Sequence, residues 1–168
     1  MKKLLIVCSV AFLGLLSTTQ VNAQAMNQTY NTALGVKVWG DGGGITFKHF
    51  VKTDRAFEAI GYFWSRGARI TGLYEFHFDF PDAPGLQWYV GPGAHVGFYN
   101  NRYYDNNPNN YPNSSAAFVG LDGVLGLDYK FDGVPINLSL DWQPSFEFGD
   151  GRGFYGGWGG LGIRYTFN

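Results

Sequence analysis

The stretch GGWGGLGIRYTFN at positions 156–168 decides the fold of this chain. Within it, Leu161, Ile163, Tyr165 and Phe167 alternate with glycine, arginine and threonine. A period of two predicts a β-strand, because successive side chains of a strand point to opposite faces of the sheet. One face of this strand is apolar, and the solvent that meets that face decides the class of protein.

The same alternation recurs along the chain and predicts eight strands in all. They are expected at 30–40, 45–52, 56–64, 69–80, 86–99, 118–131, 136–148 and 156–168. Several are longer than the roughly 5 to 6 residues typical of globular proteins and suit a tilted membrane crossing. Helix is an alternative for residues 55–60. Pro92 cannot donate a ladder hydrogen bond, so we expect a bulge or bend there.

The connections between these strands alternate in character. They are expected at 40–44, 52–55, 65–68, 81–85, 100–115, 131–135 and 149–153. If both chain ends lie on the periplasmic side, the odd-numbered connections are extracellular. The long, Asn-rich connection at 100–115 then falls outside, and the tight Asp132-Gly133 hairpin falls inside. This asymmetry of short turns and long loops is typical of outer-membrane barrels.

The first 23 residues have the pattern of a secretory signal peptide. Lys2 and Lys3 precede an apolar run at 4–16, and Val21-Asn22-Ala23 supplies a small-residue cleavage site. We therefore expect residues 24–168 to form a single barrel domain. Cleavage removes Cys8, the only cysteine, and leaves a formal charge of 10 − 13 = −3. That charge argues against a nucleic-acid partner, which would require a basic surface.

Composition favours a barrel whose apolar face meets lipid. The chain has 25 glycines and 18% aromatic residues, and a small soluble core made mostly of rings from eight strands would be overfilled. Glycines and charges fit a narrow lumen instead. The side chains expected to form a polar network there are Lys37, Lys48, Glu58, Glu75, His77, Asp79, His95, Asp122, Asp128, Lys130, Asp141, Glu147 and Arg164. Such charges must pair, because an unpaired buried ion costs several kcal/mol.

The signal peptide, the eight alternating strands and the terminal Tyr165-Thr-Phe167 resemble the small eight-stranded outer-membrane β-barrel family, of the OmpX and OmpA-transmembrane type. The resemblance covers residues 24–168. It implies an all-β fold, namely a closed, eight-stranded, antiparallel, up-and-down transmembrane β-barrel in the cell outer membrane. It also implies outer-membrane lipids as partners, together with a barrel-assembly machinery that reads the C-terminal strand.

The expected role is non-enzymatic and concerns envelope integrity or surface contact. Loop 100–115 is the expected site for a surface ligand, with Tyr103, Tyr104 and Tyr111 as contact residues, because tyrosines on a polar loop suit partner binding. Two alternatives remain open. One is a lipid-modifying barrel enzyme of the lipid A acyltransferase or deacylase type, and the other is a soluble exported barrel that holds a small ligand.

The enzyme alternative could use a histidine with Ser139 and Asp141, although no local motif marks these residues as a catalytic site. The histidines also raise a metal hypothesis, because His77 and His95 are expected on adjacent strands and carboxylates lie nearby. Their spacing matches no metal-binding motif. We therefore expect a lumenal hydrogen-bond network, with no metal or other cofactor.

Overall fold

The structure is a computed structural model that describes residues 30–40, 42–65, 67–99, 117–148 and 153–167. Its strands are β1 Thr32–Trp39, β2 Gly42–Lys52, β3 Arg55–Trp64, β4 Gly67–Asp79, β5 Leu86–Tyr99, β6 Ala117–Lys130, β7 Ile136–Trp142, β8 Ser145–Phe148, β9 Phe154–Tyr155 and β10 Gly159–Phe167. Among these residues, no helix is long and apolar enough to cross a membrane.

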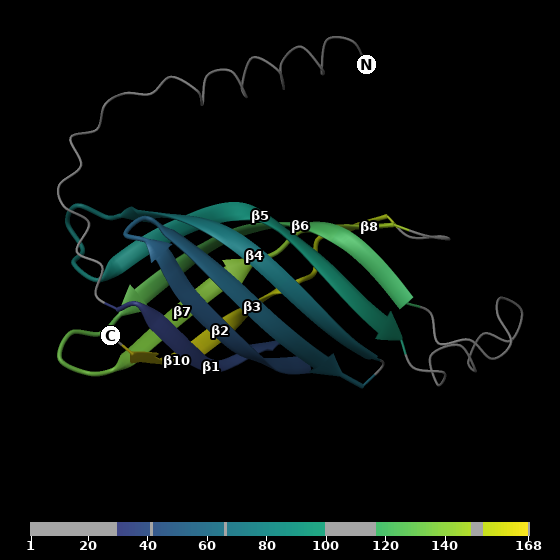
Figure 1. The fold of residues 1–168 in the computed structure, drawn as a ribbon, viewed down its shortest axis with the longest axis horizontal. Helices are drawn as coiled ribbons and strands as arrows, with labels where there is room; N and C mark the ends of the chain where they lie inside the picture. Colours follow the sequence, from purple (N-terminus) through teal and green to yellow (C-terminus); the bar gives the residue numbers. More distant parts are fainter. Residues whose placement is uncertain (1–29, 41, 66, 100–116, 149–152, 168) are drawn as a thin grey trace, which may run out of the picture.

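The strands close into a barrel with eight positions in its wall (Figure 1). Each of β1 to β6 pairs with its neighbour in the chain, β6 pairs with β7, β7 with β10 and β10 with β1. Strand β8 continues β7 along β6, and β9 pairs with β8 ahead of β10. All these pairings are antiparallel, so the predicted closed, eight-stranded, up-and-down barrel is confirmed as the fold.

The closing seam joins the first and last strands over seven residue pairs, from Thr32↔Phe167 to Val38↔Leu161. Because this pairing uses both free edges, the wall has no open edge along the seam. The stretch quoted at the start of the sequence analysis therefore closes the barrel.

The two ends of the barrel differ in their connections (Figure 1). We call one end the turn end, because it carries the turns at 53–54, 81–85 and 132–135 beside the last residues of β10. The opposite end, where β5 ends at Tyr99 and β6 begins at Ala117, is called the loop end. The predicted loop 100–115 lies outside the described residues.

Two local predictions were wrong, and one alternative is excluded. Gly42–Gly44 belong to β2 and not to a turn, because a Cβ on Gly44 would lie 2.2 Å from the carbonyl oxygen of Gly61 on β3, and glycine permits that approach. Residues 55–60 form a strand, so the helix alternative fails. No bulge forms at Pro92: β4 and β5 pair in one register on both sides, and only the ladder is interrupted. The irregularity lies instead between Phe50 and Lys52.

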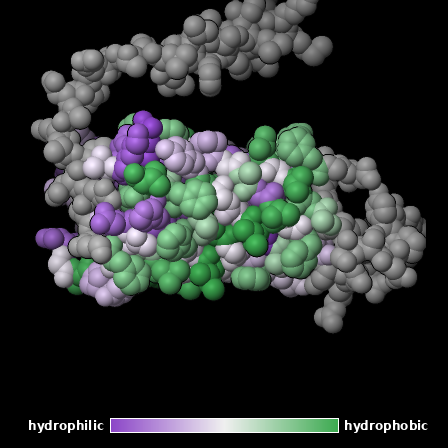
Figure 2. Space-filling view, viewed as in Figure 1, coloured by the Kyte–Doolittle hydropathy of each residue, from purple (hydrophilic) through white to green (hydrophobic). Residues whose placement is uncertain are grey.

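Apolar side chains cover the outside of the barrel, and polar ones fill its inside. Among the described residues, the buried set comprises 19 polar or charged residues and 10 apolar ones, which reverses the order of a soluble protein. In the closing strand, Ile163 is 51% exposed while Arg164 is 1% exposed. Figure 2 shows apolar side chains over much of the wall, with hydrophilic ones gathered toward the turn end.

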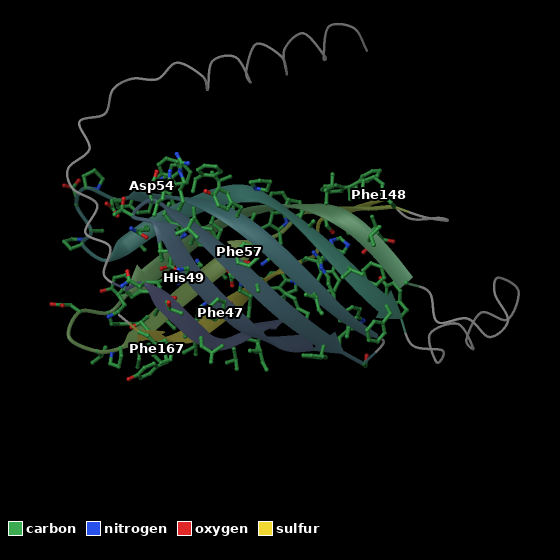
Figure 3. The ribbon with its side chains drawn as sticks, in the orientation of Figure 1. Phe47, His49, Asp54, Phe57, Phe148 and Phe167 are labelled. Carbon is green, nitrogen blue, oxygen red and sulfur yellow. The ribbon has the colours of Figure 1, made fainter. Side chains whose placement is uncertain are left out.

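Aromatic and aliphatic side chains divide the outer face into bands. Exposed rings near the turn end include Phe57, Phe78, Phe80, Tyr129 and Phe167, and those near the loop end include Trp39, Phe63, Phe98, Phe148 and Phe154. The middle of the wall carries mainly valine, leucine and isoleucine. Figure 3 shows Phe167 and Phe148 at opposite ends. Two aromatic girdles around an aliphatic band match the outer surface of a transmembrane barrel.

Candidate functional site

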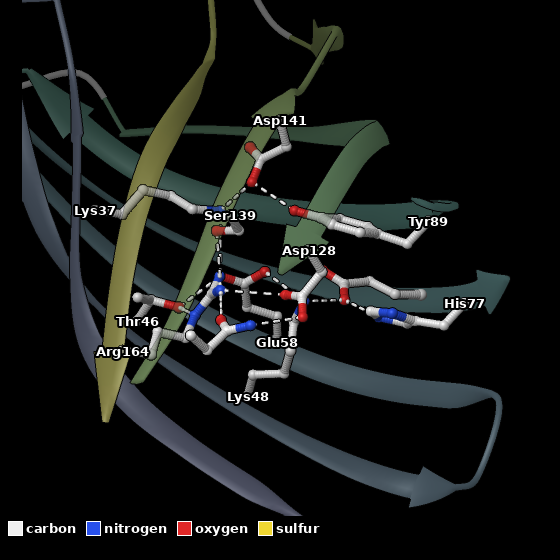
Figure 4. Close-up of polar contacts among 12 residues, drawn as sticks. Lys37, Thr46, Lys48, Glu58, His77, Tyr89, Asp128, Ser139, Asp141 and Arg164 are labelled. Carbon is white, nitrogen blue, oxygen red and sulfur yellow. Dashed lines mark hydrogen bonds and ion pairs between the residues drawn. The ribbon is translucent and has the colours of Figure 1, made fainter. Parts of the chain in front are cut away.

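The candidate functional site is the polar interior of the barrel, and Arg164 lies at its centre (Figure 4). Its side chain enters the lumen because Ile163 and Tyr165, on either side of it in β10, point outward. Arg164 Nη2 lies 2.5 Å from Glu58 Oε1, and Nη1 donates to Ser139 Oγ at 2.9 Å. The planar fork of the guanidinium lets one residue tie several strands together.

Three more contacts of Arg164 extend this arrangement. Its Nη1 donates to Asn137 Oδ1 at 3.0 Å and lies 3.6 Å from Asp128 Oδ2, while Nε donates to the Thr46 hydroxyl at 3.2 Å. Asn137 also donates from Nδ2 to Asp128 Oδ1 at 2.7 Å. These side chains come from β2, β6 and β7, on different sides of the lumen.

Lys37 on β1 joins the same group from a second direction. Its Nζ lies 2.6 Å from Asp141 Oδ2 and 3.1 Å from Glu58 Oε1. Asp141 accepts further hydrogen bonds from the Tyr89 hydroxyl and from Gln143 Nε2, each at 2.7 Å. These three donors reach both oxygens of the Asp141 carboxylate.

Lys48 on β2 completes the central group. Its Nζ lies 2.8 Å from Glu75 Oε2 and 3.3 Å from Asp128 Oδ2, and it sits 4.2 Å from the ring centre of Tyr89. His77 Nε2 is 2.9 Å from the same Glu75 oxygen. We call this group of contacting side chains the central network; its members are Lys37, Thr46, Lys48, Glu58, Glu75, His77, Tyr89, Asp128, Asn137, Ser139, Asp141, Gln143 and Arg164.

A second group, the Arg69 cluster, lies nearer the loop end. Arg69 Nη2 bonds Asp122 Oδ1, and Arg69 Nε donates to the Thr71 hydroxyl at 2.8 Å. His95 Nδ1 lies 2.8 Å from Asp122 Oδ2, and its Nε2 lies 4.0 Å from Glu147 Oε1. Sequence reasoning did not name Arg69, although the alternation in residues 69–80 places it on the same face as Thr71 and Glu75.

The structure brings most of the expected lumenal residues together and leaves two outside. Asp79 is exposed and accepts a hydrogen bond from Gln87 at 2.7 Å. Lys130 donates to the backbone carbonyls of Phe131 and Val134 at 2.7 and 2.6 Å. Both are the last residues of their strands at the turn end, where an inward-facing position already opens to water. Tyr103, Tyr104 and Tyr111 lie outside the described residues.

The contacts of the histidines bear on the metal and enzyme alternatives. His77 and His95 contact Glu75 and Asp122, whereas Ser139 accepts its hydrogen bond from Arg164, so the described contacts assemble no serine–histidine pair. The third histidine, His49, lies on the outer face (Figure 3). Within the described parts of the chain, no group of three or more His, Cys, Asp or Glu side chains could hold a metal ion.

Aromatic rings pack against one another inside the barrel toward both ends. At the turn end, the ring of Tyr30 meets Phe50 edge to face at 5.2 Å, and both pack with Ala33 and Ala56. At the loop end, Trp158 contacts Tyr62 at 5.9 Å and Trp64 at 5.3 Å between ring centres. Between these layers, Ile60, Leu73 and Val124 fill space beside the two polar groups.

Comparisons with known proteins were made by sequence and by structure. No protein-family model matches the sequence, and no curated protein is significantly similar to it. Among solved structures, the N-terminal β-barrel domain of Pseudomonas aeruginosa OprF matches with a TM-score of 0.57 and 18% identity, covering 81% of this chain and 94% of that one. The chain therefore has the fold of the small eight-stranded outer-membrane β-barrels, as the sequence resemblance predicts.

Proposed function

We propose that this protein is an integral outer-membrane β-barrel of a Gram-negative cell. The observation that carries the proposal is the reversed distribution of side chains: the wall exposes aliphatic residues such as Ile45 and Ile70 at about 60%, while lysine and glutamate lie inside at 0%. An exposed apolar surface of this extent would drive a soluble barrel to associate, whereas lipid covers it. The likeness in fold to the OprF domain supports the same environment.

The role we propose is non-enzymatic and concerns envelope integrity or contact at the cell surface. The buried cations of the lumen contact carboxylates, and Ser139, the candidate nucleophile, accepts a hydrogen bond from Arg164. The rings at both ends and the packed interior support a barrel without a general diffusion pore. We assign surface contact to the loop end, with Tyr103, Tyr104 and Tyr111 as the contact residues.

The proposal also predicts which end of the barrel faces the outside of the cell, and this orientation can be tested. With the loop end outside, a cysteine at Ser65, in the exposed turn between β3 and β4, should react with a membrane-impermeant maleimide on intact cells. A cysteine at Thr53, in the exposed turn between β2 and β3, should react only after lysis. The matched pair samples both ends of strand β3. Labelling of Thr53→Cys but not Ser65→Cys on intact cells would reverse the orientation, and equal labelling of both in a soluble extract would refute insertion.

A further inference from the structure

The loop end holds a pocket that the proposed role does not use. Its volume is about 330 Å³, within the range of roughly 300–1,000 Å³ found for small-molecule sites. Its lining consists of Trp39, Gly40, Gly42, Tyr62, Phe63, Trp64, Tyr99, Tyr155, Gly157 and Trp158. All of these lining residues are aromatic residues or glycines, and none of them is charged.

The pocket exists because the closing seam stops short of the loop end. Pairing between β1 and β10 reaches Val38↔Leu161, and the chain before β10 leaves the strand at 156–158. Two indole N–H groups take the place of the ladder there: Trp39 donates to the carbonyl oxygen of Gly157, and Trp142 donates to that of Gly156 at 2.7 Å. These bonds hold a glycine segment, which has no side chains to fill the space, at one side of the cavity.

The rings that form the inner wall are held at steep angles to one another. Trp64 meets Trp158 at 68° and Tyr99 at 78°, and Tyr62 meets Trp158 at 51°. In an edge-to-face pair, the ring that contributes its edge keeps both of its faces, so ring faces remain for a ligand to pack on. The hydroxyl of Tyr62 donates to the carbonyl of Gly159 at 2.5 Å, which fixes this ring in place.

Three observations define the chemistry of the ligand. The uncharged lining favours a neutral molecule. The indole N–H groups of Trp64 and Trp158 have no hydrogen-bond partner within the described chain, so a ligand with acceptor oxygens would satisfy them. The Arg69 guanidinium lies 4.5 Å from the ring centre of Trp158 and already occupies a face of that ring. A ligand cation is therefore disfavoured, and a bare hydrocarbon chain would leave both donors unmet.

We propose that this pocket binds the pyranose ring of a neutral saccharide. A pyranose presents flat C–H faces to aromatic rings and hydroxyl oxygens at its rim, which matches ring walls with two indole donors that have no partner among the described residues. The volume suits one or two sugar rings. The inference stands on the geometry of the loop end alone and does not depend on which side of a membrane that end faces.

The test is a titration of the folded protein in lipid nanodiscs that contain no glycolipid. Glucose, galactose and N-acetylglucosamine and their disaccharides are added, and indole N–H resonances with tryptophan fluorescence report binding. We expect saturable shifts of the indole signals assigned to Trp64 and Trp158. Trp64→Leu should weaken binding by about tenfold or more. Trp64→Phe keeps a ring but no donor, and its affinity should fall between the two.

Trp88→Leu is the matched control, because Trp88 stacks on Phe78 at the opposite end of the barrel. It removes one tryptophan and should leave the saccharide affinity unchanged. Each variant is first checked for folding by its unheated mobility on a gel. The proposal is overturned if no saccharide gives a saturable shift, if Trp64→Leu binds as well as the parent, or if tetramethylammonium or a fatty acid saturates the pocket where sugars do not. A lipopolysaccharide nanodisc then distinguishes a membrane glycan from a free one.

Discussion

Arg164 is the residue on which the interior depends most, because its guanidinium contacts side chains from β2, β3, β6 and β7. Among the buried described residues there are four lysines and arginines against six aspartates and glutamates. Each of the cations Lys37, Lys48 and Arg164 lies within 4.0 Å of at least two carboxylates. Removing one cation therefore takes an ion-pair partner from more than one buried carboxylate.

Arg164→Met should destabilise the barrel by about 3–5 kcal/mol, because it keeps a long side chain but removes the guanidinium that both Glu58 and Asp128 contact. Urea unfolding in lipid vesicles, followed by tryptophan fluorescence, measures the loss. The double variant Arg164→Met/Glu58→Gln should recover part of it. Arg55→Met is the control, since Arg55 pairs with Asp54 at the exposed turn end and should cost about 0–1 kcal/mol. If Arg164→Met and Arg55→Met were equally stable, the contacts of Arg164 would not contribute to the stability of the barrel.

Gly126 tests whether glycines make room for the lumenal side chains. A Cβ there would lie 2.5 Å from the ring of Tyr89 and 2.7 Å from Asp141 Cβ, so Gly126→Ala should cost about 1–3 kcal/mol by overpacking. Gly72 is the matched control, because its Cβ would meet only the Phe57 ring at 3.6 Å. The same urea titration compares the two. A Gly126→Ala barrel as stable as Gly72→Ala would show that the lumen has spare room.

At the scale of the strands, alternation in the sequence predicts most of the wall. This prediction succeeds in the closing stretch because apolar and polar or glycine positions alternate there without a break. It fails at element ends, where Asp79 and Lys130 continue the pattern although the lumen has already opened to solvent. It also misreads Gly42–Gly44, since glycine in a strand and glycine in a turn look alike until the approach of β3 is known.

Register at the seam can be tested by disulfide formation. Val36 and Ile163 are partners across β1 and β10, and antiparallel partners lie within the distance that a disulfide spans. Val36→Cys/Ile163→Cys should therefore crosslink on mild oxidation of the folded protein, which changes its mobility after heating. Val36→Cys/Leu161→Cys, offset by two residues, should crosslink far less. Preferential crosslinking of the offset pair would mean that the barrel closes in another register.

In the molecule as a whole, the barrel is closed along its seam, and its middle is filled by side chains. The sequence predicts which face of each strand turns inward, but it does not predict which lumenal charges meet. Lys37 and Asp141 are 104 positions apart, and their contact depends on the stagger of all eight wall positions. The contacts among the rings at the loop end could not be predicted for the same reason, because Tyr62, Trp64 and Trp158 meet only when the barrel closes.

We propose that this closed barrel lies in the outer membrane and is held there by its apolar outer face. Fractionation of expressing cells combined with gel mobility before and after heating tests both parts in one measurement. The account predicts that the protein sediments with the outer membrane, that only detergent releases it, and that the unheated form migrates faster than the heated one. Release into the periplasmic fraction without detergent would contradict the account.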